Sequence, residues 1–235
     1  MMRLLAALLL STLLTSSSPL PAAPALTPDS AQRIATAPED ASVQLYRGPE
    51  EGGLFHQALL QVDGRFDAYD WTGSTAEASP PQLYVQDVNQ DGVKEAVVIL
   101  TVMSGTGTEV QNIHVVNLET LAEVPVEDAG HFVQSQVSSK VDAGDGQHPV
   151  KIEVTFRGQR TLLDIKPSDL YDDPSNFYSA LDFTSYVVYD TSLNELHATV
   201  SGSVSPSEFV GDFELVYRFE EGRFLIDQVA FVPYQ

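Results

Sequence analysis

One stretch of the chain carries residues whose types and spacing could bind a metal ion. It reads DVNQDGVKE and places oxygen-bearing side chains at its first, third, fifth and ninth positions. Ca²⁺ takes about 6–8 oxygen ligands at about 2.3–2.6 Å, and alternate side chains of a tightly turning loop can point toward one centre. The expected ligands of a bound Ca²⁺ are the side chains of Asp87, Asn89, Asp91 and Glu95 and the backbone carbonyl of Val93.

The sequence around this acidic loop, residues 87–95, indicates what kind of loop it is. Gly92 stands at the sixth position, where a sharp turn through positive φ favours a residue without Cβ. An EF-hand would need a bidentate Glu at position twelve and a following helix, but that position is Val98, within the β-branched run 96–102. We therefore expect the loop to join two strands. The alternative is an ordinary Asp/Asn/Gly-rich turn that binds no ion.

The acidic loop and the apolar run that follows it resemble the calcium loop of FG-GAP and VCBS repeats, found in integrin α-chains and many secreted bacterial proteins. In that family the motif Asp-x-Asp/Asn-x-Asp-Gly-x-x-Asp lies between two strands of a propeller blade. By motif, the family's ligand positions correspond to Asp87, Asn89, Asp91 and Glu95. The resemblance covers residues 82–116, has Glu at the ninth position where the family usually has Asp, and occurs once. It implies a calcium-binding repeat without establishing a propeller.

The N-terminus has the pattern of a secretory signal peptide. Basic Arg3 precedes the apolar run 4–14, and small residues follow as far as Ala25. We expect cleavage after Ala25, at the Ala23-Pro24-Ala25 site, and so a signal peptide over residues 1–25 and a secreted protein. The apolar run is shorter than the roughly 20 residues of a membrane span, so no stable membrane anchor is expected.

The composition limits the class of partner. The chain has 33 acidic and 12 basic residues, and its formal net charge is -21. Such a surface repels nucleic acid and anionic membranes, and it raises the local concentration of cations. We therefore expect no nucleic acid partner. The absence of cysteine excludes disulfides, so an exported chain of this kind must be stabilised by its core or by bound metal.

The elements that must position the acidic loop are mainly antiparallel strands. Short turns with Gly or Asn separate several segments of strand character; they lie at 63–64, 157–159, 191–194 and 220–222. No fixed period of roughly 20–50 residues indicates a repeat fold. We expect a mainly β fold with antiparallel sheets and hairpins in a single domain, residues 43–235. Residues 26–42 lack periodicity, and we expect them to be a flexible leader.

Two further segments differ from the strand pattern. In residues 126–141, Val133, Val137 and Val141 recur every fourth residue, and Asp128 lies where a helix start favours negative charge. This spacing predicts one short amphipathic helix packed on the sheet. Residues 104–108, SGTGT, lack the lysine and the following helix of a phosphate loop, so we expect a strand-to-strand turn beside the acidic loop.

The remaining chemistry is sparse. Gly-x-Ser-x-Gly and His-Glu-x-x-His do not occur, and the five histidines lack ligand spacing. We expect a secreted, calcium-binding, β-rich binding or structural module, whose partner is an unknown extracellular protein or glycan, rather than an enzyme. The alternative is a secreted hydrolase with a structural calcium site. A deep pocket with two carboxylates of divergent pKa would favour the hydrolase, and a shallow surface would favour binding.

Overall fold

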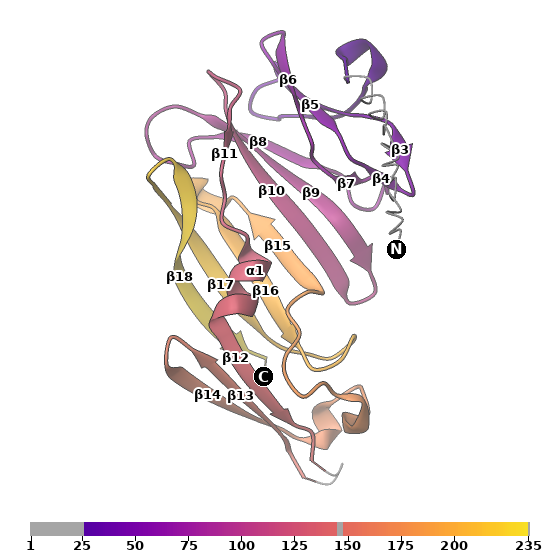
Figure 1. Cartoon of the computed structure of the whole chain (residues 1–235), viewed down its shortest axis with the longest axis vertical. Helices are drawn as coiled ribbons and strands as arrows, with labels where there is room; N and C mark the ends of the chain where they lie inside the picture. Colours follow the sequence, from indigo (N-terminus) through magenta and orange to yellow (C-terminus); the bar gives the residue numbers. More distant parts are fainter. Residues whose placement is uncertain (1–25, 145–147, 235) are drawn as a thin grey trace, which may run out of the picture.

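The computed structural model describes residues 26–144 and 148–234 of the chain. The protein is mainly β, as the sequence predicts, with antiparallel sheets and one α-helix. Figure 1 shows the sheets following one another along the long axis, with the helix beside the middle one. Residues 1–25, where we expect a signal peptide, lie outside the described residues. Within the described part, no helix is long and apolar enough to cross a membrane.

The largest sheet has eight strands and forms the middle of the molecule. In spatial order its strands are β18 (Arg223–Pro233), β17 (Phe209–Glu220), β16 (His197–Ser203), β15 (Tyr186–Asp190), β10 (Thr108–Asn117), β9 (Glu95–Gly105) and β8 (Gln82–Gln86), with β11 (Glu123–Val124) beside β10. Neighbours pair antiparallel, apart from the parallel pair of β10 and β15. This central sheet carries the acidic loop, which joins β8 to β9.

Three smaller sheets complete the fold. One contains β1 (Gln32–Thr36), β2 (Val43–Arg47), β5 (Ala58–Val62) and β6 (Arg65–Tyr69). The others are β3 (Glu50–Glu51), β4 (Leu54–Phe55) and β7 (Gly73–Ser74), and β12 (Val137–Asp142), β13 (Val150–Phe156) and β14 (Gln159–Ile165). The helices are α1 (Ala129–Gln136) and the 3-10 turns η1 (Pro28–Ser30), η2 (Pro167–Asp169), η3 (Pro174–Asn176) and η4 (Ser192–Asn194).

The predicted hairpin turns are confirmed. Asp63 and Gly64 have φ of 50° and 78° and join β5 to β6. The same pairing of positive φ values recurs between β13 and β14 and between β17 and β18. Two consecutive residues with positive φ give a turn whose twist matches that of paired strands, which explains why each of these turns has glycine at its second position.

The helix is shorter than predicted. It begins after Asp128, whose Oδ1 accepts a hydrogen bond from the His131 backbone N–H at 2.6 Å, and it ends at Gln136. Val137 and Val141 lie instead on β12. A spacing of four places side chains on one side of a helix and also on one face of a strand, so the pattern did not distinguish the two.

Two other expectations need correction. Ordered structure begins before Val43, because β1 lies within the segment expected to be a flexible leader and pairs with β2. The paired residues are 8 to 15 positions apart in the chain, and the pairing is not visible in the local pattern. The SGTGT segment does form the turn between β9 and β10, but this turn is at the opposite end of β9 from the acidic loop.

The first seven residues of strand β9, residues 95–101, are buried on both faces and join two hydrophobic cores. Val97 and Ile99 belong to the core beneath α1, with β12–β14 and β15–β18. Ala96, Val98 and Leu100 point the other way into the core shared with β2 and β5. This double burial explains the continuous apolar run in the sequence. It also fixes the position of the first residue of β9, which closes the acidic loop.

Candidate metal centre

The acidic loop connects two paired antiparallel strands, as expected. Gln86 and Glu95 face each other in register at the end of the β8–β9 pair, so the loop closes directly on the sheet. Gln90 has a φ of 60° and Gly92 a φ of 90°. The positive φ at Gly92 confirms the conformation expected at the sixth position, where a residue with Cβ is disfavoured.

The loop is organised by side chains that accept hydrogen bonds from its own backbone. Asp87 Oδ1 accepts from the Asp91 N–H at 3.1 Å, and Asp87 Oδ2 accepts from the Gly92 N–H at 3.0 Å. Asn89 Oδ1 also accepts from the Asp91 N–H at 3.0 Å. Asp91 Oδ1 accepts from the Val93 N–H at 2.8 Å. These bonds turn the chain around the side chains expected to bind the ion.

Three of the expected ligands meet through one amide group. Asn89 Nδ2 donates to Asp91 Oδ2 at 3.0 Å and to Glu95 Oε1 at 3.0 Å. The second oxygen of Glu95, Oε2, accepts from the Val88 N–H at 3.2 Å. Asn89 therefore contacts both Asp91 and Glu95, whereas both oxygens of Asp87 accept from backbone amides.

Glu95 is a buried carboxyl group without a cationic partner. Its exposed fraction is 0 %. Burial raises its pKa to about 7, and the nearby charges of Asp91 and Asp87 add to this effect against the hydrogen bonds from Val88 and Asn89. The adjacent Lys94 is exposed. Over residues 26–144 and 148–234, no ion pair joins a Lys or Arg to any of the three loop carboxylates.

The donor set suits Ca²⁺, but the side chains are not arranged as an open coordination shell. Among the described residues, no group of three or more His, Cys, Asp and Glu side chains is placed to hold a metal ion. In the loop, Asn89 turns its nitrogen, not its oxygen, toward the two carboxylates. The N–H of Val93 donates a hydrogen bond to Asp91, and the carbonyl of Val93 remains only an expected ligand.

Sequence reasoning did not identify the contribution of Val88 or the burial of Glu95. Val88 is 5 % exposed and packs in the core beneath α1, which brings its N–H to the Glu95 carboxylate. The available signal was the position of Glu95 directly before the apolar run 96–102. A residue that begins a strand buried on both faces is itself expected to be buried.

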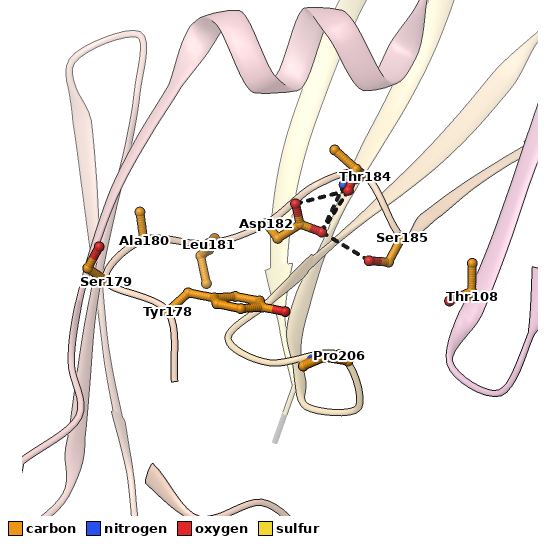
Figure 2. A pocket seen from close by; sticks show the side chains of 9 residues that line it. All are labelled: Thr108, Tyr178, Ser179, Ala180, Leu181, Asp182, Thr184, Ser185 and Pro206. Carbon is orange, nitrogen blue, oxygen red and sulfur yellow. Dashed lines mark hydrogen bonds between the residues drawn. The ribbon is translucent and has the colours of Figure 1, made fainter. Parts of the chain in front are cut away.

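The pockets of the described chain bear on the hydrolase alternative. One pocket, of about 510 Å³, is bordered by Asp182 and Tyr178. Figure 2 shows the Asp182 carboxylate hydrogen-bonded to Thr184 and Ser185, and it is the one carboxylate among the residues that line this pocket. A pocket of about 320 Å³ lies between the acidic loop and the β17–β18 hairpin and is lined by two carboxylates, Glu195 and Asp227. Each has a basic neighbour: Asp227 is paired with Arg218 at 3.2 Å, and Glu195 lies 3.6 Å from His197 Nε2.

No protein-family model, no curated protein and no solved structure matches the chain. What bears on function is therefore the geometry of the acidic loop, the chemistry of its side chains and the resemblance of its motif.

Proposed function

We propose that the acidic loop binds one Ca²⁺ and that the chain is a secreted, calcium-stabilised β module that binds an extracellular protein or glycan or has a structural role. The side chains of Asp87, Asn89, Asp91 and Glu95 and the carbonyl of Val93 would hold the ion. The observation that carries the proposal is the group of acidic side chains around the fully buried Glu95, which no Lys or Arg side chain of the described residues neutralises. The resemblance to FG-GAP and VCBS calcium loops supports it.

Electrostatics gives the physical reason. Asp91 and Glu95 lie within hydrogen-bond distance of the same Asn89 nitrogen, and Asp87 lies close enough to raise the pKa of Glu95. An amide N–H offers only a partial positive charge to these carboxylates. A divalent cation would replace it as their positive partner and turn mutual repulsion into attraction. Water would complete the shell, because Ca²⁺ usually has more ligands than this loop provides.

Bound calcium would stabilise the fold because the loop lies where the core beneath α1 meets the start of β9. Val88 anchors one side of the loop in the core beneath α1, and Glu95 begins the strand that joins both cores. An ion held by the loop would fix the end of the β8–β9 pair against the rest of the central sheet. This is a stabilising role, and it leaves partner binding to other surfaces of the module.

Isothermal titration of the chelator-treated protein with Ca²⁺ tests the proposal. We expect one site, with a dissociation constant of about 10⁻⁴ to 10⁻³ M as in extracellular calcium modules. Asp91→Ala should remove the binding heat because it deletes a central ligand. Lys94→Ala is the matched control and should keep the affinity, since this exposed side chain is not an expected ligand. Equal titration of Asp91→Ala and the parent would reject the site.

A further inference from the structure

A pocket of about 380 Å³ lies on the central sheet away from the acidic loop, and aromatic rings form its walls. Tyr186 comes from β15, Phe209 from the start of β17, and Tyr234 follows the end of β18. The rings of Tyr186 and Phe209 meet edge to face, with centroids 6.2 Å apart. Val187 and Tyr189 alternate with the pocket residues of β15 and belong to the core, so the pocket opens on the other face of the sheet.

One carboxylate is fixed at the pocket. Asp212 Oδ1 accepts hydrogen bonds from Ser201 Oγ at 2.6 Å and from Tyr234 Oη at 2.8 Å, and both of these residues line the pocket. No described residue donates a hydrogen bond to the other oxygen, Oδ2. The contact with Asp212 also holds the Tyr234 ring at the pocket, although that side chain is 53 % exposed. Asp212 therefore keeps one acceptor oxygen for a ligand.

The surroundings of the pocket are negative. Glu109 on β10 pairs in register with Tyr186, and together with Asp212 it raises the pKa of the Tyr186 hydroxyl, although burial of that group is the larger cause. None of the residues that line the pocket is Lys or Arg. The chain as a whole carries a formal net charge of -21. An anionic ligand would be repelled here, and a cationic ligand attracted.

The turn between β9 and β10 closes one side of the pocket. Gly107 has a φ of +69°, and a Cβ at this position would lie 3.1 Å from the Pro206 carbonyl oxygen and 3.6 Å from the Phe209 ring. Glycine is therefore required both by its backbone conformation and by the close approach to Pro206. The SGTGT segment, which has no role in the acidic loop, helps to hold Phe209 in place.

We propose that this pocket binds a small organic cation through a quaternary ammonium group, of the kind that choline carries. The negative faces of aromatic rings attract a cation within about 6 Å of the ring centroid, and methylated ammonium groups also bury apolar surface against those rings. The Asp212 carboxylate supplies the opposite charge; its attraction is electrostatic, because a quaternary ammonium group has no N–H to donate. The volume is within the range of about 300–1,000 Å³ that is usual for small-molecule sites.

Titration calorimetry with choline chloride tests the proposal on the full chain, at constant ionic strength and with calcium present. The uncharged comparison is the alcohol in which a tert-butyl group replaces the trimethylammonium group. We expect saturable binding of choline and binding of the alcohol weaker by about tenfold or more. No saturable binding at millimolar choline, or equal affinity for the two compounds, would overturn the proposal.

Variants locate the binding to this pocket. Asp212→Asn keeps an acceptor for Ser201 and Tyr234 but removes the charge, and Tyr234→Leu removes one ring at the exposed end of the chain. Each should weaken choline binding by about five- to tenfold. The matched controls are Glu220→Gln, an exposed acid farther along the same strand, and Tyr171→Leu, a tyrosine that is 94 % exposed. Controls that weaken binding as much as the pocket variants would contradict the assignment.

Discussion

Glu95 is a carboxyl group with 0 % exposure that begins an apolar strand, and burial raises its pKa to about 7 from the ordinary value of 4.5. A carboxyl group whose pKa is higher in the folded state holds its proton more tightly there than in the unfolded chain. The stability gained from this tighter proton binding is complete below pH 4.5 and is lost as pH rises through about 7. Without calcium, the ionised form of this residue opposes folding. Bound Ca²⁺ would remove that cost.

The Glu95→Gln variant tests whether ionisation of Glu95 opposes folding when calcium is absent. In the presence of a chelator, the variant should be more stable than the parent at about pH 8 by up to roughly 3 kcal/mol, and this advantage should shrink toward about pH 5. Urea unfolding at both pH values measures the difference. Glu77→Gln, at an exposed position, is the control and should show no such pH-dependent gain. An equal gain at both pH values would show that ionisation of Glu95 is not the cause.

At the scale of single elements, helix α1 depends on its N-terminal cap. Asp128 Oδ1 accepts the His131 N–H, and Ala129 and Val133 bury the helix against the core. An eight-residue helix is too short to be stable alone, so the cap and the buried face must hold it together. Asp128, which the sequence placed at the helix start because of its negative charge, is this capping residue.

Replacing the cap should therefore destabilise the fold measurably. We expect Asp128→Ala to lower the free energy of unfolding by about 1 kcal/mol, because a backbone N–H at the helix start loses its acceptor. Asp128→Asn keeps an oxygen at the same position and should cost only a fraction of that amount. Denaturant unfolding of both variants measures the difference. If the two changes were equally costly, the lost charge and not the capping bond would explain the effect.

Local sequence predicted the elements whose cause is local. The Asp63-Gly64 turn and the β9 run depend on backbone conformation and on burial of consecutive side chains, and both were confirmed. The pairing of β1 with β2 and the change from helix to strand at Val137 depend on which segment lies alongside, and no spacing of residues within one segment records this.

In the whole molecule, too, features built from consecutive residues could be predicted, and features built from distant segments could not. The acidic loop is nine consecutive residues, so its motif and its position between strands could be predicted from the sequence. The aromatic pocket takes Tyr186, Phe209, Asp212 and Tyr234 from separate parts of the central sheet, and only the folded structure brings them together. The two sites are far apart in the chain, and their tests are independent.

The most direct test of the calcium account is thermal unfolding of the parent protein in calcium, in an equal concentration of magnesium, and in a chelator. At a Ca²⁺ concentration of about one hundred times the dissociation constant, binding to the native state alone adds about 2.7 kcal/mol. For a chain of this size the melting temperature should rise by about 5 to 10 °C. Magnesium should give a smaller rise, because it demands a stricter octahedral geometry. The same melting temperature in calcium and in chelator would contradict the account and leave the acidic loop as an ordinary turn.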